Sequence, residues 1–365
     1  MSRRFVTPNG PRAYLAGAIG VAGATVGGLV LLILALSVEL SARPSEPPGA
    51  LVAAVSAKPA PLPATGRFDL REEPRTVFRG QWLHDRRHVP QSFAFDDVNG
   101  FLYVLQVEGT NAAGTFAEHS QRGDLTLTKL TRDGRAIAGH MTLRGFGHGV
   151  ALGVEPLGAE AFLWTEVDSQ PNDAGVGRGT RIGRFRFKSG ATLDTASPQL
   201  EKFDLIAGAR TCTPSLDLAH GRLALRHVRD GEMRVTLYDL AAVKAGRAQP
   251  LRDISLAFPF GTAQGWCTFG SCVYVLAGQA YGPANPPPGN ATVWCLDWNT
   301  GAVVDHQPVH ALPDLVYREP EGLAVSVSDG APRLCVGFGA SVSAQDSQRQ
   351  LSLVEFSSFR PVPLP

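Results

Sequence analysis

The chain has 365 residues, 44% of them hydrophobic, and its 34 basic and 33 acidic side chains leave a formal net charge of +1. A chain this close to neutrality has no basic field to hold a phosphate backbone, so nucleic acid is excluded as the expected partner. Its 40 glycines and 27 prolines suit a fold with many turns. About 300 residues follow the N-terminal region, enough for one large core.

The first expected element is an apolar segment near the N-terminus. Residues Ala13–Val38 carry no charge, and about 26 residues in a helix span about 39 Å, more than the roughly 30 Å of a hydrocarbon core. Arg3, Arg4 and Arg12 precede the segment, which places the rest of the chain outside the cytoplasm. A retained anchor and a cleaved signal peptide both fit, and the length favours the anchor. We expect residues 1–42 to be a cytoplasmic tip followed by a signal-anchor helix.

A linker is expected next. Residues 43–66 are rich in proline and alanine, as in Pro59–Ala64. Such a composition cannot build a packed core and gives a semi-extended spacer of up to roughly 70 Å. The folded domain is therefore expected to cover residues 67–365.

Five segments of this domain repeat one pattern, which we call the signature. A polar residue or proline is followed by glycine or serine, then a large apolar residue, then a short one. The spacing of about 50 to 66 residues matches a four-stranded propeller blade with its loops. The signatures are Gln91–Phe95, His148–Leu152, Pro214–Leu218, Gln264–Thr268 and Glu321–Val325.

Strand patterns follow each signature. Asn99-Gly100 lies between two apolar runs and predicts a hairpin. Alternating apolar and polar residues in Asp124–Leu130 and Ala138–Leu143 complete a first blade. The fifth blade runs out of chain after three strands, so we expect Thr76–Arg79 to supply its fourth and close the ring. The expected fold is an all-β, single five-bladed β-propeller closed by an N-terminal strand, with a β-sandwich as the alternative.

The cysteines leave two interpretations open. There are five of them, and an odd number in an exported chain leaves at least one thiol free. Cys267 and Cys272 flank a tight turn and could pair across a hairpin. Burial as small core residues is the other interpretation, and the spacing matches no zinc motif.

A ring of polar residues is expected at one mouth of the propeller channel. The innermost strand of each blade lines the channel, and the second strand returns to the same face. We call the nine residues placed there the collar and expect them to bind a ligand. The collar consists of Gln91, Gln106, His148, Glu166, Arg226, Gln264, Arg318, Glu319 and Glu321. The alternative is that these side chains hold waters and bridge blades.

Some of these residues also suggest catalysis. His148 with Glu166 could form an acid/base pair, with Glu321 as a further candidate. A neutral histidine held by a structural hydrogen bond is the competing interpretation. Asp96 and Asp97 admit a calcium ion, although an Asx turn explains them better. No cofactor and no resident metal are expected.

Four segments carry a resemblance to a known family. Gln91–Asp96, Gly145–Val150, Leu163–Glu166 and Glu319–Ala324 resemble the TagC-like β-propeller family. That family includes proteins labelled teichoic acid biosynthesis protein C and receptor-binding or baseplate proteins of phages that attack Gram-positive cells. The resemblance covers roughly residues 67–365. It implies a five-bladed propeller in contact with wall glycopolymers and supplies no catalytic residues.

Together these patterns predict an extracytoplasmic monomer, either anchored in the membrane or secreted into the cell wall. Its expected partners are a cell-wall glycan, through the collar, and the membrane, through the N-terminal helix. A binding module is favoured over an enzyme. A hydrolase or transferase acting on the same polymer and a scaffold for a partner protein are the alternatives. Trp164, Trp266 and Trp298 could stack on sugar rings, although core packing is favoured for each.

Overall fold

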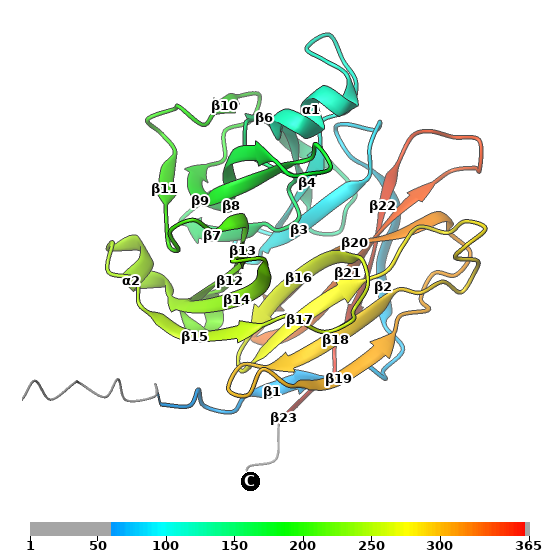
Figure 1. The fold of residues 1–365 in the computed structure, drawn as a ribbon. Coiled ribbons are helices and arrows are strands. Elements are labelled where there is room, and N and C mark those ends of the chain that lie inside the picture. Colours follow the sequence, from blue (N-terminus) through cyan, green and yellow to red (C-terminus); the bar gives the residue numbers. More distant parts are fainter. Residues whose placement is uncertain (1–59, 362–365) are drawn as a thin grey trace, which may run out of the picture. The chain divides into compact units, whose positions relative to one another are not determined.

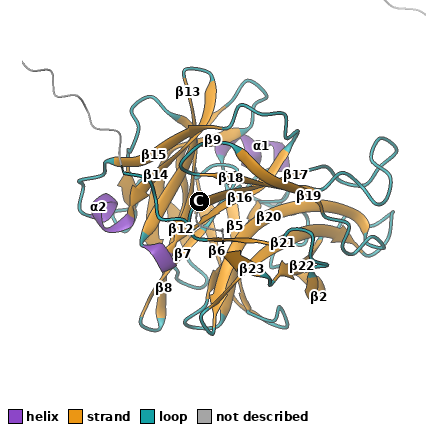
Figure 2. Ribbon diagram, turned by 90° about the horizontal axis from the view of Figure 1, so that it is seen from below, coloured by secondary structure: helices purple, strands orange, loops and turns teal. Residues whose placement is uncertain are grey.

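A computed structural model describes residues 60–361, which form a closed ring of five β-sheets around a central channel (Figure 1). Figure 2 views the same ring from below. The compact unit begins at Ala57. The predicted anchor Ala13–Val38 and most of the predicted linker lie outside the described residues. Within residues 60–361, no helix is both long enough and apolar enough to cross a membrane.

Blades one and two are built from consecutive antiparallel strands, with one exception. Blade one has the spatial order β3-β4-β5-β6-β10, and its outermost strand is parallel to its neighbour. Blade two has the order β7-β8-β9-β11. The bounds in blade one are β3 Pro90–Asp96, β4 Phe101–Val107, β5 Leu125–Thr131, β6 Ile137–Arg144 and β10 Thr192–Asp194. Those in blade two are β7 Gly153–Leu157, β8 Glu160–Pro171, β9 Gly177–Arg186 and β11 Glu201–Phe203.

Blades three and four follow the simple four-stranded order along the chain. Blade three consists of β12 Arg210–Asp217, β13 Arg222–Arg229, β14 Glu232–Asp239 and β15 Pro250–Ser255. Blade four consists of β16 Ala263–Phe269, β17 Cys272–Ala277, β18 Thr292–Asp297 and β19 Val303–Pro308. Blade five contains β20 Val316–Ser328, β21 Ala331–Ser341 and β22 Gln350–Phe356.

Two contacts between distant parts of the chain close the ring. β2 (Arg75–Trp82) pairs with β22 as the outer strand of blade five, with Thr76 opposite Val354. This confirms the predicted closing strand. The patterns did not predict the second contact, in which β1 (Gly66–Phe68) pairs with β23 (Phe359–Pro361) outside the blades. Both ends of the described chain are therefore tied to the ring.

The helices are short and lie in connections. α1 (Phe116–Arg122) has a capping box between Thr115 and Glu118, and Gly123 ends it in the left-handed conformation. α2 (Leu240–Lys244) is capped by Asp239, and a 3-10 turn covers Leu218–His220. In Figure 1, α1 lies at the end of the ring opposite to β1 and β23.

The small second residue of the signature lets neighbouring inner strands approach each other. Gly322 has φ +85°, and a Cβ atom there would lie 2.8 Å from the Phe93 ring and 3.1 Å from the Ser92 backbone. A Cβ atom added at Gly265 would lie 2.7 Å from the backbone nitrogen of Leu323. The Ser92 hydroxyl donates to the Gly149 carbonyl at 2.6 Å. Five strands can meet around so narrow a channel only if this position stays small.

The apolar core is divided among the five interfaces between neighbouring blades. One buried cluster fills each interface. Trp164, Trp266 and Trp298 are at most 2% exposed, and each indole N–H donates to a side-chain oxygen. All three tryptophans are core residues, in agreement with the favoured interpretation that they pack in the core and do not stack on sugar rings. All five cysteines are buried free thiols, so Cys267 and Cys272 do not pair in this structure.

The structure differs from the sequence prediction in two places. The second signature, His148–Leu152, precedes its strand, because β7 begins at Gly153. Gly147 and Gly149 have φ values of +153° and +79°, which regular strands do not use. The last part of the predicted linker, from Ala60, lies on the propeller, where the Leu62 N–H donates to Asn299 at 2.8 Å.

Replacing Gly322 tests the packing argument. Gly322→Ala should lower the free energy of unfolding by about 3 kcal/mol, because it adds left-handed strain and overlap with Phe93. Gly330→Ala is the matched control, since Gly330 has φ +72° and no atom within 4 Å of the added Cβ. The control should lose only about 1 kcal/mol in urea denaturation. Equal losses would mean that strand approach does not require the small residue.

Candidate functional site

The collar residues lie where the inner strands begin, and we call this end of the channel the collar end. Gln91, Gln264 and Glu321 come from inner strands of three blades, β3, β16 and β20. Arg226 lies opposite Thr213 across the β12–β13 pair. His148 precedes β7. The sequence pattern therefore placed these residues at one end, as predicted, although their individual roles differ.

Glu166 is a structural residue, and its carboxylate does not face the His148 ring as an acid/base partner would. It is fully buried and accepts backbone N–H groups from His148 at 3.1 Å, Gly149 at 2.7 Å and Gly179 at 2.7 Å. These bonds fix the irregular backbone of the second signature. These contacts favour a structural role for Glu166 over the acid/base pair with His148, which was the less favoured interpretation.

Burial favours the neutral form of the His148 imidazole. It lowers the pKa of this ring to about 3, with further lowering by the charges of Arg178 and His88. Its Nδ1 atom is buried and has no hydrogen-bond partner among the described residues. The low pKa favours the interpretation of a neutral histidine, although no hydrogen bond on Nδ1 holds the ring.

Two further collar residues brace the framework. Arg318 donates to the carbonyls of Ala311 at 2.9 Å and Val309 at 2.6 Å and stacks over Phe338. It is therefore a buried brace between blades four and five, not a channel residue. Gln106 donates to the carbonyls of Asp85 and His88, and only its Oε1 atom lacks a partner.

Arg226 is the most unusual residue of the site. Its side chain is 5% exposed, and its Nε has no acceptor among residues 60–361. Burial lowers its pKa to about 10, and the charge of Arg178 contributes. A buried guanidinium without a full set of acceptors costs stability. This part of the channel is therefore suited to a molecule that supplies acceptor oxygens.

A cavity of about 710 Å³ opens between blades two and three at the collar end. Arg178, Arg181 and Arg210 line it, together with Asp173 and Asp204. Arg178 lies close enough to act on both Arg226 and His148, so this cavity and the channel form one electrostatic environment. The arginines make it favourable for an anion.

Two carboxyl groups occupy the other side of the channel. Burial raises the pKa of Glu319, and burial together with Glu319 raises that of Glu321 well above its usual value. Gln264 donates to Glu319 at 3.5 Å. Tyr317, just upstream, has φ +71°, a strained value for a large residue. The raised pKa favours the protonated form of Glu321, which could donate a hydrogen bond.

The raised pKa of Glu321 predicts a pH dependence of stability. Below pH 4.5, the usual pKa of this side chain, folded and unfolded chains are both protonated; as the pH rises, the unfolded chain loses the proton first and stability falls. Glu321→Gln removes this dependence, so in urea denaturation its stability relative to the natural chain should increase as the pH rises above 4.5. The exposed Glu160→Gln is the control. A constant difference at all pH values would contradict a raised pKa.

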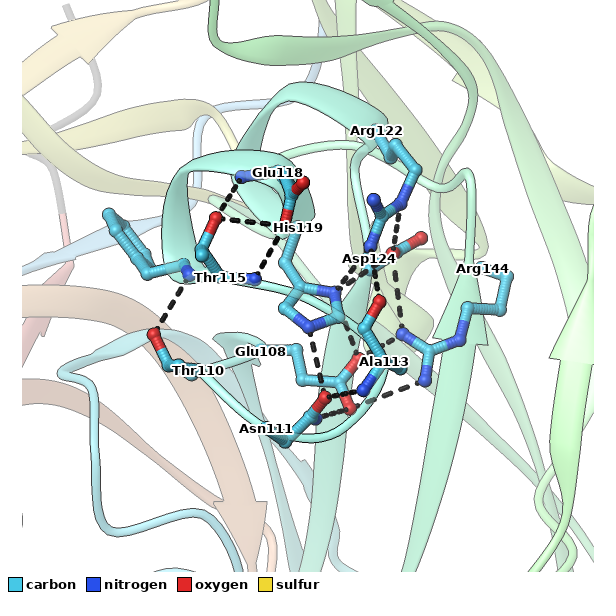
Figure 3. Close-up of polar contacts among 12 residues, drawn as sticks. Glu108, Thr110, Asn111, Ala113, Thr115, Glu118, His119, Arg122, Asp124 and Arg144 are labelled. Atoms are coloured by element: carbon cyan, nitrogen blue, oxygen red, sulfur yellow. Dashed lines mark hydrogen bonds and ion pairs between the residues drawn. The ribbon is translucent and has the colours of Figure 1, made fainter.

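The sequence analysis missed a buried polar network beside the collar end. Glu108, His119 and Asp124 come from the end of β4, from α1 and from the residue before β5, and Figure 3 shows them facing one another. Their ligand atoms all lie within 4.8 Å of one another. The capping box around Thr115 is the sequence signal that could have indicated this helix and its histidine.

Hydrogen bonds define the state of this network. Asn111 Oδ1 accepts the Ala113 N–H at 2.7 Å, which identifies this atom as the amide oxygen. Because an oxygen of this kind only accepts, His119 Nε2 donates to it at 3.2 Å. His119 Nδ1 lies 3.0 Å from a carboxylate oxygen of Asp124, to which it can donate, and 3.0 Å from the Arg122 guanidinium, from which it can accept in the other tautomer. Burial alone would raise the pKa of Asp124, but hydrogen bonds from His119, Arg122 and a backbone amide outweigh it and lower the pKa.

The network has the composition of a divalent-metal site, yet two guanidinium groups already neutralise it. Arg144 pairs with Glu108 and lies 3.3 Å from Asp124, and Arg122 donates to Asp124 at 2.9 Å. The two carboxylates and two guanidinium groups balance in charge. Glu108, His119 and Asp124 could hold a cation only if the arginines moved, so we assign the network to fixing α1 and its loop.

Removing Arg144 tests this assignment. Arg144→Ala should lower the free energy of unfolding by about 3 kcal/mol, because it leaves two buried carboxylates with one guanidinium. Arg144→Ala combined with Glu108→Gln should recover part of the loss. Arg186→Ala removes an exposed pair with Glu160 and should cost less than about 1 kcal/mol. An Arg144→Ala loss as small as this control would contradict the assignment. Urea denaturation measures all three.

Comparisons with known proteins agree with this architecture. Residues 89–339 match the family described as the phage 5-bladed beta propeller receptor binding platform domain. "Putative major teichoic acid biosynthesis protein C" of Bacillus subtilis (strain 168) is 26% identical over 283 residues, 74% of this chain and 60% of that protein. The tail fiber of Staphylococcus aureus phage P68 superposes with a TM-score of 0.62 at 19% identity, over 78% of this chain and 52% of the fiber. The chain thus spans about half to three fifths of the length of these proteins.

Proposed function

Because this chain belongs to the phage five-bladed β-propeller receptor-binding platform family, we propose that it is a binding module for a cell-wall glycopolymer. The family match agrees with the resemblance expressed by the signatures. The name of the Bacillus subtilis relative refers to teichoic acid, and the fiber with the similar fold belongs to a phage of Staphylococcus aureus. The first of these supports a wall polymer of the teichoic-acid type as the ligand.

The observation that carries the proposal is the set of unpaired buried polar atoms at the collar end. Arg226 Nε is a donor without an acceptor, Gln106 Oε1 is an acceptor without a donor, and His148 Nδ1 also lacks a partner. A polyol chain offers hydroxyl groups that donate and accept, and phosphate oxygens that accept. Such a ligand would reach these buried atoms once the side chains that cover them turn aside, and the cavity lined by Arg178 would favour its negative charge.

The chain's entry point supports an outward-facing collar. The described chain begins at Ala60, and Thr65 contacts Ser271 in the turn after the inner strand β16, at the end of the channel opposite to the collar. We call this opposite end the entry end. A tether leading from here to a membrane would leave the collar pointing away from it. We accordingly propose an extracytoplasmic monomer, anchored or secreted into the wall.

A hydrolase or transferase is the second candidate. Glu319 and Glu321 favour it, because a protonated and a titrating carboxyl group can act as acid and base. The scaffold alternative has no comparable support, since it requires none of these unpaired atoms. Release of polymer fragments during binding experiments would separate the enzyme from the binding module.

Arg226→Met provides the test. Isothermal titration of the protein with purified wall teichoic acid should show at least about a tenfold loss of affinity, because a charged hydrogen bond is worth roughly 1.5–3 kcal/mol. The same variant should melt at a higher temperature, because a buried charge without acceptors is removed. If Arg226 had a purely structural role, its replacement would instead lower the stability of the protein.

Controls make the outcome specific. Arg135→Met removes an arginine whose side chain is 87% exposed at the entry end, and it should change neither affinity nor stability. Unchanged teichoic-acid binding by Arg226→Met would refute the collar as the binding site. Absence of binding by the natural chain to both teichoic acid and a neutral wall polysaccharide would refute the proposed function.

A further inference from the structure

The entry end of the channel carries several exposed apolar side chains. Val98, Leu157 and Leu218 are 74%, 58% and 44% exposed. Each stands at or just after the end of an inner strand, β3, β7 or β12, in three consecutive blades. Val98 and Leu218 also line a cavity of about 300 Å³ at this end, whose walls include Phe95, Val154, Leu216, Trp266 and Val327. We call these three residues with the cavity the apolar mouth.

The polar groups at the apolar mouth are already engaged. Asp97 pairs with Arg132 and accepts the Val327 N–H at 2.7 Å. Asp217 accepts the Gly270 N–H at 2.7 Å and contacts His220 at 2.9 Å. Neither carboxylate is available to attract a cation or a polar ligand. The surface therefore fits an apolar partner, in contrast to the collar end with its unpaired donors and acceptors.

The course of the chain identifies the partner. Thr65 covers the turn at Ser271, next to the apolar mouth, and the chain leaves the propeller from this end toward its N-terminus. The uncharged stretch Ala13–Val38 precedes Ala60 by a spacer of about 21 residues, at most about 65 Å when extended. A spacer of this length would keep the apolar mouth within reach of a bilayer that holds that stretch.

From this arrangement we infer that the apolar mouth docks on the lipid surface, with Val98, Leu157 and Leu218 inserted at the headgroup boundary. Shallow insertion of aliphatic side chains supports interfacial binding, and exposed basic residues such as Arg135 and Lys188 at the same end favour anionic lipid. Three side chains give only weak binding. A tether raises the local concentration of the face at the membrane, so weak binding suffices.

The test uses residues 57–365, the compact unit with its own core, so that the predicted anchor cannot contribute. Sedimentation with vesicles of phosphatidylglycerol and phosphatidylcholine measures partitioning. The variant Val98→Ser, Leu157→Ser, Leu218→Ser should partition at least about tenfold less than the natural sequence. The matched control carries Phe116→Ser, Val316→Ser and Val342→Ser, three exposed apolar residues of the collar end, and should partition within about twofold of the natural sequence.

Each other outcome overturns the inference. The inference would be refuted if residues 57–365 did not bind these vesicles at any lipid concentration. It would also be refuted if the two triple variants lost vesicle binding equally. If the natural sequence dimerises in analytical ultracentrifugation and only the Val98, Leu157 and Leu218 variant is monomeric, the face belongs to a second copy instead. Teichoic-acid titration of the same variant should be unchanged, so failure here is distinct from failure of the collar proposal.

Discussion

The close approach of five inner strands around a narrow channel is the constraint on which the rest of the structure depends. It requires a small residue at the second position of each signature, where Gly322 and Gly265 have backbone atoms at contact distance. Because the strands are close, each interface between blades can be filled by one apolar cluster. The ring must also be closed, and β2 in blade five and the β1–β23 pair bring both ends of the described chain into it.

The same closeness explains the electrostatics of the collar end. Polar side chains at this end are buried, and burial favours the neutral form of each of them. It lowers the pKa of His148 to about 3, raises that of Glu321 and lowers that of Arg226 to about 10. A protein that kept these groups only for stability would pair them, as it pairs Arg318 with two carbonyls. Unpaired groups beside paired ones at one end of a channel indicate a ligand more strongly than polarity alone.

Sequence patterns predicted the parts of this fold that depend on local repetition. The signatures indicated the blades, and the shortage of chain after Glu321 indicated that Thr76–Arg79 closes the ring. The parts that depend on contacts distant in sequence were not predictable. β10 leaves blade two to pair with β6, and β1 meets β23 across nearly the whole domain.

The sequence predicted where the collar residues lie in the channel but not what each of them does. Strand periodicity placed Glu166 and Arg318 at the correct end of the channel. It could not indicate that three backbone amides bind the first, or that the second turns toward Val309. The network around His119 was missed because its members are 16 residues apart at most but belong to an irregular loop and a short helix. No strand pattern describes such a segment.

The third position of the signature separates the two ends of the channel. Phe93, Trp266 and Leu323 are at most 4% exposed and belong to the apolar clusters that fill the interfaces between blades. Each inner strand runs through this layer from the collar end to the entry end. A polymer at the collar and a lipid surface at the apolar mouth would therefore contact opposite ends of the ring and would not compete, which gives the propeller two faces of opposite chemistry.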